Sequence, residues 1–263
     1  FMAFFTSLYS GSSGNCSVVR CEGKYLLIDM GKSCRTTLNA LKEMGLAVAD
    51  MQGILVTHEH SDHIQGLRVF LKHYNVPVYG CSATLDNLLD MELVPPAAEL
   101  IAIEGRPEEI GGFVVEAFPT SHDVPCCGYR IRTPDGGVMA IATDLGVLTP
   151  QVHQALAGVK LAALESNYDR NCLMMGSYPY HLKRRIQSDR GHLDNAECAA
   201  KVLELLQDGC EKIALCHLSR ENNTPELALA TVREAILCAG LVPGENVVIQ
   251  AQKRNEPSDW MEF

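Results

Sequence analysis

The chain has 263 residues, of which 47% are hydrophobic and 21% charged, and its formal net charge is −10. Because no internal repeat, low-complexity tract or Pro/Gly-rich linker divides it, residues 1–263 are predicted to form a single domain. The acidic balance argues against a broad electrostatic grip on nucleic acid, so a polyanionic substrate would need a local basic strip and metal ions.

The first predicted element is a strand at the apolar start of the chain. Phe1-Met2-Ala3-Phe4-Phe5 has no basic leader and no cleavage-site pattern, so it is typical of a strand rather than of a signal peptide. The hydrophobic periodicity of the first half then predicts strands at 4–9, 17–20, 24–29, 52–57 and 76–79, and helices at 36–44 and 64–73.

The second half repeats this alternation without repeating its sequence. Strands are predicted at 100–103, 113–118, 128–132, 138–143, 161–164, 212–216 and 247–250, and helices at 178–186, 195–206 and 225–238. Two groups of strands, each with its own helices, predict an α/β fold, a four-layer αββα sandwich. No apolar run approaches the roughly 18 residues that span a bilayer, so no membrane insertion is expected.

The 11 cysteines are an odd number, so at least one is unpaired, and no two have the CxxC spacing. Most sit in apolar runs, where cysteine acts as a small hydrophobe. The pattern predicts neither a disulfide framework nor a structural zinc site, and it indicates a reducing cytoplasm. The oligomeric state stays open.

The strongest chemical signal directly follows the strand at 52–57, where His58, His60, Asp62 and His63 fall within six positions. His58 and His60 alternate onto one side of an extended segment and can chelate one ion. Asp62 and His63 lie where the chain turns into a helix and can face a second ion. Imidazole and carboxylate together suit zinc, manganese or iron, whereas a solvated polar loop seldom gathers four such groups by accident.

This segment resembles the HxHxDH signature of the metallo-β-lactamase superfamily, which implies further ligands at later strand ends. The chain offers one candidate at each such place: His122, Asp144 and His217. The resemblance implies two divalent ions, one held by His58, His60 and His122, the other by Asp62, His63 and His217, with Asp144 between them. Such ions, roughly 3.5–4 Å apart, hold a bridging hydroxide as the nucleophile. Asp29 either orients a histidine or caps its own strand.

Two residues between Asp144 and His217 bear on the type of hydrolase. Glu165 ends an apolar strand, and His192 precedes a helix. Ribonucleases Z and J are similar here, which implies that His192 protonates the leaving oxygen and that Glu165 orients it. Together with Asp62, these are the predicted catalytic residues. A solvated strand end and a helix-entry residue are the alternative interpretations.

A narrower resemblance covers nearly the whole chain. Its motifs are 7–15 (SLYSGSSGN), 164–167 (LESN), 188–195 (SDRGHLDN) and 218–227 (LSRENNTPEL), and they look like the bacterial YycJ/WalJ family. That family implies a metal-dependent 5′→3′ exonuclease acting on double-stranded DNA.

Several polar residues are candidate contacts to a phosphate or to the substrate: Ser12, Ser13, Asn15, Asn167 and Arg190. The backbone N–H groups of the Gly-bearing turn 10–15 face an anion in one interpretation and form a tight hairpin in the other. The basic residues at 183–185 contact a nucleic-acid backbone or decorate a solvated helix. Neither a large inserted domain nor a long arm fits between Asp144 and His192, so a compact nuclease core is expected.

Two other functions remain open. An acyl hydrolase, such as a thioesterase, a lactonase or a weak β-lactamase, would leave His192 structural. A metal-binding or redox-sensing protein would use the thiols and show no hydrolysis. The main prediction is a dinuclear phosphodiesterase whose substrate is nucleic acid, DNA in the family, and whose cofactors are Zn²⁺ or Mn²⁺, with iron as another option.

Overall fold

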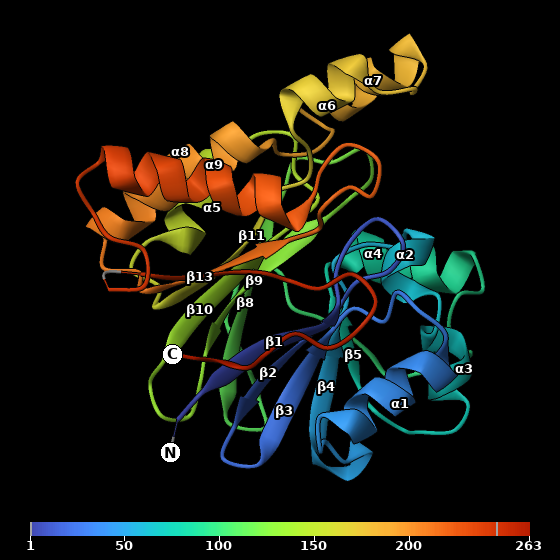
Figure 1. The fold of residues 1–263 in the computed structure, drawn as a ribbon. Coiled ribbons are helices and arrows are strands. Elements are labelled where there is room, and N and C mark those ends of the chain that lie inside the picture. The colour runs from blue at the N-terminus through green and yellow to red at the C-terminus, as the bar shows by residue number, and fades with distance from the viewer. Residues whose placement is uncertain (1, 246) are drawn as a thin grey trace.

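The computed structural model describes residues 2–245 and 247–263, so Phe1 of the predicted first strand lies outside the described residues. Within them, the strands form two sheets (Figure 1). In spatial order the first sheet contains β14 (Met261–Glu262), β1 (Phe4–Tyr9), β2 (Cys16–Cys21), β3 (Lys24–Ile28), β4 (Met51–Leu55), β5 (Val78–Gly80) and β6 (Leu100–Ala102). The second contains β13 (Val248–Ala251), β12 (Lys212–Cys216), β11 (Leu161–Glu165), β10 (Val138–Ala142), β9 (Cys127–Arg132), β8 (Phe113–Pro119) and β7 (Glu108–Ile110).

Both sheets combine an antiparallel part with a parallel part. β1, β2 and β3 pair antiparallel, and β3 to β6 run parallel to one another. In the second sheet β7 to β10 pair antiparallel, and β10 to β13 run parallel. Because parallel strands present their carboxyl ends at one edge, residues that follow β3, β4, β10, β11 and β12 are available for a common site.

Helices cover the outer face of each sheet (Figure 1). The helices beside the first sheet are α1 (Cys34–Glu43), α2 (Ser61–Ile64), α3 (Leu67–Leu71) and α4 (Ser82–Asp90). Those beside the second are α5 (Pro150–Leu156), α8 (Asn195–Gln207) and α9 (Pro225–Cys238). None of the helices in the described part of the chain is long and apolar enough to cross a membrane.

Three hydrophobic clusters fill the spaces between these layers. One lies between the sheets and joins Phe5 and Leu26 of the first sheet to Tyr129 and Met139 of the second. The other two lie between each sheet and its own helices. Three filled spaces separate four layers, so the predicted αββα sandwich is confirmed.

The predicted elements differ from the structure in several places. The single helix expected at 64–73 is two short helices, because the backbone N–H of Gly66 donates to the carbonyl of Met30 and the chain turns there. A Cβ on Gly66 would lie 2.3 Å from the carbonyl oxygen of Lys32. The elements that the sequence prediction missed are the 3-10 helix η1 (Val48–Asp50), α4, α5, α6 (Arg170–Met175), β7 and β14. Thr149 caps α5 and Pro150 begins it, a start signal that the sequence contained.

The segment between Asp144 and His192 was predicted to hold neither a large inserted domain nor a long arm. It carries a short helical hairpin, α6 (Arg170–Met175) and α7 (Tyr180–Ile186), which stands out from the body of the molecule (Figure 1). No residue of α7 is buried.

Candidate metal centre and active site

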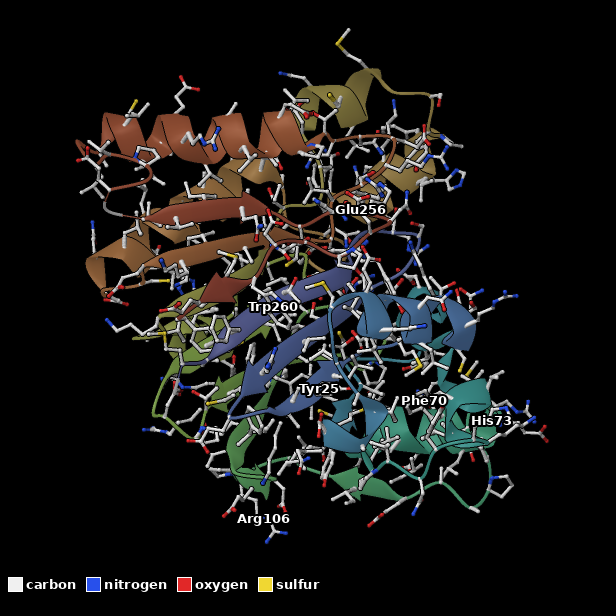
Figure 2. All side chains as sticks on the ribbon, turned by 60° about the horizontal axis from the view of Figure 1, so that its bottom comes forward. Tyr25, Phe70, His73, Arg106, Glu256 and Trp260 are labelled. Carbon is white, nitrogen blue, oxygen red and sulfur yellow. The ribbon has the colours of Figure 1, made fainter. Side chains whose placement is uncertain are left out.

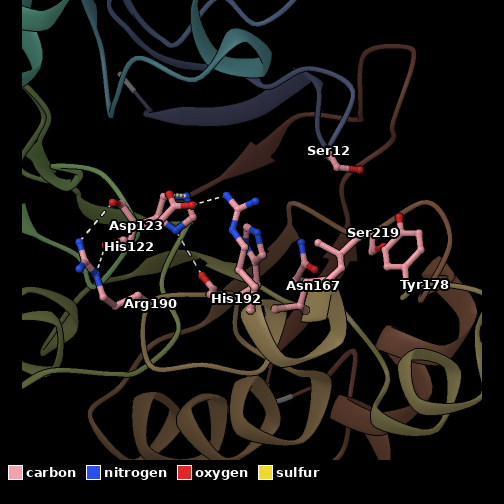
Figure 3. A pocket seen from close by; sticks show the side chains of 12 residues that line it. Ser12, His122, Asp123, Asn167, Tyr178, Arg190, His192 and Ser219 are labelled. Carbon is pink, nitrogen blue, oxygen red and sulfur yellow. Dashed lines mark hydrogen bonds and ion pairs between the residues drawn. The ribbon is translucent and has the colours of Figure 1, made fainter. Parts of the chain in front are cut away.

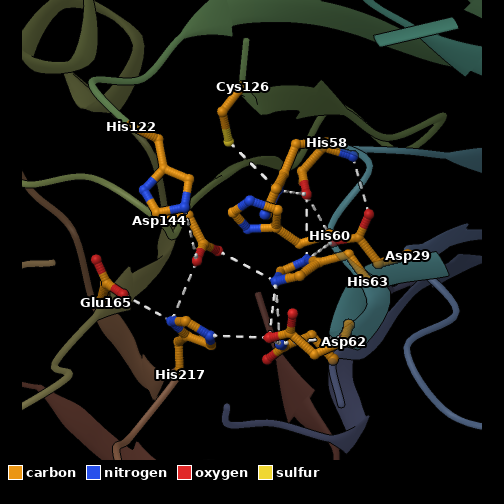
Figure 4. Close-up of polar contacts among 12 residues, drawn as sticks. Asp29, His58, His60, Asp62, His63, His122, Cys126, Asp144, Glu165 and His217 are labelled. Atoms are coloured by element: carbon orange, nitrogen blue, oxygen red, sulfur yellow. Dashed lines mark hydrogen bonds and ion pairs between the residues drawn. The ribbon is translucent and has the colours of Figure 1, made fainter. Parts of the chain in front are cut away.

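The turns that follow β4, β8, β10 and β12 bring seven side chains together at one edge of the sandwich (Figure 4). Four local groups of ligand atoms each lie within 4.8 Å of one another: His58, His60 and His122; Asp62, His63 and His217; His58, His63 and Asp144; and Asp144, Glu165, His192 and His217. The first two groups are the two predicted ligand sets, and the third connects them through Asp144.

Backbone geometry aims three of the acidic and imidazole groups inward. Asp29, Asp144 and His217 each follow a strand with a left-handed backbone, at φ of 61°, 58° and 56°. Asp and His adopt this conformation more readily than most residues, yet it costs energy that the surrounding structure must supply. Strain at three strand ends around one centre is typical of a functional site rather than of an ordinary turn.

Four buried polar atoms in the cluster have no hydrogen-bond partner among the described residues. They are Nε2 of His58, Nε2 of His122, Oδ2 of Asp144 and Nε2 of His217. Each buried polar atom without a partner destabilises the folded state by about 1–3 kcal/mol. Four such atoms in one place therefore indicate that a bound group satisfies them. All four are electron-pair donors suited to a divalent cation, so the residues present fit metal ions.

The second nitrogen of each buried imidazole is held by another residue. His63 Nδ1 lies 2.7 Å from Asp29 Oδ2, and His122 Nδ1 donates to the carbonyl of Gly191 at 3.3 Å. Thr57 Oγ1 donates to Asp29 Oδ2 at 2.9 Å, so it accepts from His58 Nδ1 at 3.0 Å. These bonds fix the tautomers with Nε2 turned inward, the arrangement found around metal-binding histidines.

Asp29 therefore orients residues that follow the neighbouring strand β4 and does not merely cap its own strand. Its two oxygens accept from the N–H and hydroxyl of Thr57 and hold His63. Burial raises the pKa of the Asp29 carboxyl, and the opposing effects of His63 and Thr57 are too small to cancel this rise.

Replacing Asp29 by asparagine is expected to weaken binding of one metal ion about 10–100-fold, because an amide cannot accept at both positions that Asp29 uses. Titration against a metallochromic chelator measures the change. The matched control is Asp50→Asn, which alters an exposed aspartate. Unchanged affinity in Asp29→Asn would show that His63 needs no orienting partner.

Glu165 ties two histidines together. It is fully buried, and its Oε1 lies 2.8 Å from His192 Nδ1 and 2.7 Å from His217 Nδ1. Its Oε2 accepts from the backbone N–H groups of Leu145 and Leu193, each at 3.1 Å. Burial would raise the pKa of Glu165, but the charges and hydrogen bonds of His192 and His217 outweigh it and lower the pKa to about 2. An ionised Glu165 keeps hydrogen on both Nδ1 atoms, which leaves His217 Nε2, 3.6 Å from Asp62 Oδ2, as the nitrogen with a free electron pair in the centre.

The remaining carboxylates of the centre are also held ionised. Burial would raise the pKa of Asp144, but the nearby His217, His63 and His58 hold it well below its usual range. Burial likewise opposes ionisation of Asp62, but His217 and His63, whose Nε2 atoms lie 3.6 Å and 3.5 Å from Asp62 Oδ2, lower its pKa. Charged oxygens among neutralising imidazoles are ready ligands for a cation.

A cavity of about 200 Å³ opens beside the cluster (Figure 3). His122 and His192 line it on the side of the metal cluster, and Arg190 donates to the carbonyl of His122 at 2.9 Å. Its other lining residues are Ser12, Asp123, Asn167, Tyr178, Leu182, Arg185, Ile186, Gly191 and Ser219.

The predicted substrate contacts fall in different places. Ser12, Asn167 and Arg190 line the cavity, whereas Ser13 is exposed and is not among its lining residues. Asn15 is buried with Nδ2 at 3.1 Å from His63 Nε2. Asn167 Nδ2 donates to the carbonyl of His217 at 2.7 Å, so it supports a residue of the cluster.

Of the two interpretations of the turn 10–15, an anion site and a tight hairpin, the backbone N–H groups of Ser10, Gly11, Gly14 and Asn15 favour the hairpin. The N–H of Gly11 donates to Asn15 Oδ1, that of Gly14 to the carbonyl of Gly11, and that of Asn15 to the carbonyl of Asp62. The Ser10 N–H is also taken, by the carbonyl of Lys253. These four groups hold the turn together and are not free for a ligand.

Asp123 is a site residue that sequence reasoning missed. Its Oδ1 lies 3.5 Å from His60 Nε2 and 3.3 Å from His122 Nε2, and its other oxygen pairs with Arg185. Burial would raise its pKa, but Arg185 and the two histidines lower it. Its place next to His122 in the sequence was the available signal.

Comparisons with known proteins agree with this geometry. A family model described as "Beta-lactamase superfamily domain" matches residues 24–217. The chain is 36% identical over 244 residues to "Exodeoxyribonuclease YycJ" of Bacillus anthracis, covering 92% of each chain. It is 33% identical over 243 residues to "Exodeoxyribonuclease WalJ" of Streptococcus pneumoniae, covering 91% of this chain and 90% of the relative.

Solved structures share the fold at low identity. The metallo-β-lactamase fold protein YhfI of Bacillus subtilis superposes with a TM-score of 0.72 at 15% identity, covering 99% of both chains. The short form of human tRNase Z superposes with a TM-score of 0.64 at 18% identity, covering 97% of this chain and 98% of that one.

Proposed function

We propose, because this chain belongs to the metallo-β-lactamase superfamily, that it is a metal-dependent exodeoxyribonuclease. Within the superfamily it belongs to the family of the YycJ and WalJ exodeoxyribonucleases. The observation that carries the proposal is the union of a His/Asp metal cluster with the Glu165–His192 pair at a cavity. The 5′→3′ direction and the preference for duplex DNA, which the family resemblance implies, are part of the proposal.

Two divalent ions, Zn²⁺ or Mn²⁺, are the proposed cofactors. His58, His60 and His122 would hold one, and Asp62, His63 and His217 the other, with Asp144 between them. Bound there, the ions would supply a nucleophile at neutral pH and neutralise charge that develops on the phosphate. Nitrogen and carboxylate donors suit both metals, so geometry and supply decide between them.

His192 is the proposed general acid. Its side chain is partly exposed at the cavity, while Glu165 holds its Nδ1 hydrogen. The proton on Nε2 is then directed away from Glu165 and can pass to the oxygen that leaves when the phosphodiester bond breaks. Glu165 keeps the ring of His192 from rotating.

The cavity wall supplies positive charge for the phosphates. Arg185 and Arg190 both line it, and each is anchored on the 122–123 turn by Asp123 or by a backbone carbonyl. Lys183 donates instead to the carbonyls of Met174 and Gly176, so it serves to hold α6 against α7. Arg184 is exposed and is not among the lining residues, so Arg185 and Arg190 remain as the proposed contacts to the nucleic-acid strand at the cavity.

Digestion of end-labelled nucleic acids by metal-reconstituted protein tests the proposal. Double- and single-stranded DNA and RNA are compared, with Zn²⁺ or Mn²⁺, and His60→Ala is the inactive control. We expect a label at the 5′ end of duplex DNA to be released first, as short products. Cleavage of RNA alone would assign a ribonuclease. Hydrolysis of thioesters or lactones without any cleavage of nucleic acid or of bis-p-nitrophenyl phosphate would assign an acyl hydrolase.

A further inference from the structure

Three cations gather beside the turn 10–15, outside the catalytic cavity: Lys32, Arg220 and Arg254. Lys32 Nζ donates to the carbonyl of Arg254 at 3.2 Å and to Asn255 Oδ1 at 2.9 Å, and it lies 4.9 Å from the ring centroid of Tyr9. These partners are neutral, so they hold the ammonium in place without cancelling its charge. None of the three cations is among the residues that line the cavity.

The positive charge of this cluster is poorly compensated. Burial and the charge of Arg254 lower the pKa of Lys32, and burial and the charge of Arg220 lower that of Arg254. Arg254 Nη1 is buried and has no hydrogen-bond partner within the described part of the chain. The carboxylate paired with the cluster is that of Glu221, 3.6 Å from Arg220 Nε, and both of these side chains are exposed. In a chain of net charge −10, such a concentration points to an external anion.

The turn 10–15 places this cluster next to the catalytic cavity. A Cβ on Gly11 would lie 2.8 Å from Arg254 Nη1, and one on Gly14 would lie 2.5 Å from Lys32 Cγ. The two glycines also have φ of 145° and 152°, a conformation that residues with a side chain rarely adopt. Glycine at both positions lets the two cations lie close to the backbone of the turn. Ser12 of the same turn lines the cavity. Arg220 directly follows Ser219, another cavity residue.

The C-terminal segment fixes Arg254 in this position. The Ser10 N–H donates to the carbonyl of Lys253, and the Lys253 N–H donates to Ser258 Oγ at 2.8 Å. The Ser258 N–H donates in turn to the carbonyl of Ser7 in β1. The guanidinium is thus held on a braced segment rather than on a free tail, as a pre-formed binding site requires.

We propose that Lys32, Arg220 and Arg254 bind a backbone phosphate of the nucleic-acid strand at a distance from the phosphodiester bond that is cleaved. The proposal rests on the proposed nuclease function and deepens it. Arg185 of the cavity pairs with Asp123 and Arg190 donates to backbone carbonyls, whereas Arg254 Nη1 has no acceptor among the described residues and Lys32 is held by neutral groups. The cluster is therefore the better site for an additional phosphate. A substrate longer than a single nucleotide would span both places, and a small diester would reach only the cavity.

Neutral variants of the three cations test this. Lys32→Met, Arg220→Gln and Arg254→Gln are each compared with Arg106→Gln, which removes an exposed cation far from the turn (Figure 2). Binding of a labelled duplex is followed by fluorescence anisotropy in calcium buffer over a range of salt concentrations. Each variant is expected to bind roughly tenfold more weakly, and to lower the slope of log Kd against log salt by about one. Arg106→Gln should change neither.

Cleavage of bis-p-nitrophenyl phosphate separates the two proposals. If wild-type protein does not cleave it or DNA with any metal, the nuclease proposal fails. If it does, and the three variants keep the wild-type salt slope, only the phosphate site is refuted. Loss of small-diester cleavage in the variants would also overturn it, since the cluster would then act on the catalytic cavity itself. Arg254→Lys, which keeps the charge, should restore the slope, and the exposed Arg220 gives a variant whose folding is not at risk.

Discussion

Replacing His192 by alanine is expected to lower kcat on duplex DNA by roughly 10²–10³-fold while leaving cleavage of bis-p-nitrophenyl phosphate within about tenfold of wild type. A sugar oxygen is a poor leaving group and needs the proton that His192 Nε2 would give. The p-nitrophenolate ion leaves without one. Steady-state kinetics on both substrates, with equal metal content in both proteins, measure the ratio.

His192 gives a cleaner test than Glu165, because Glu165 Oε1 holds His217 as well as His192. Glu165→Gln would therefore disturb the metal centre and the general acid together. The matched control is His73→Ala, which removes an exposed histidine remote from the site (Figure 2). Equal slowing on both substrates would remove the leaving-group role from His192, and an unchanged kcat on both would make His192 structural.

Replacing Asp62 by alanine is expected to abolish detectable cleavage, a loss of at least roughly a thousandfold, and to lower bound metal from about two ions per chain to about one. A metal ion contributes several kcal/mol of transition-state stabilisation, and each 1.4 kcal/mol or so is a factor of ten. Elemental analysis of the loaded protein and digestion of labelled DNA give the two readouts.

The fold should survive this substitution. The Asp62 side chain is a quarter exposed, and the backbone N–H of Asn15 donates to the backbone carbonyl of Asp62, which alanine keeps. The substitution removes the longer bond, 3.4 Å, from Asn15 Nδ2 to Asp62 Oδ2. His63→Ala is a poorer choice, because His63 is fully buried and its loss would deprive Asp29 of a partner. Asp86→Ala on the exposed face of α4 is the control. Two retained ions with full activity in Asp62→Ala would remove Asp62 from the ligand set.

Much of this site was predictable because its signals are local. His58, His60, Asp62 and His63 occupy one short segment, so spacing alone brings them together. The other candidates each follow a predicted strand, and strand ends meet at one edge of a sandwich. What stayed hidden depends on distant contacts: Glu165 reaches His217 over 52 positions.

The fold was predictable where apolar periodicity is strong. The long helices α8 and α9 and the buried strands of both sheets agree closely with their patterns. The helix at 64–73 was wrong because the break at Gly66 comes from packing against residues 30–32, which no local pattern reveals. The two-residue strand β14 likewise exists only because β1 offers it an edge.

The seven candidate ligands are divided between the two halves of the sandwich. His58 to His63 follow β4 in one sheet, and His122, Asp144 and His217 follow strands of the other. Neither half carries all the ligands of both ions, so the bound cations would connect the two sheets. Removal of the metal ions by a chelator would then do more than stop catalysis. It would also weaken the packing of one sheet against the other, so that activity and stability would be lost together.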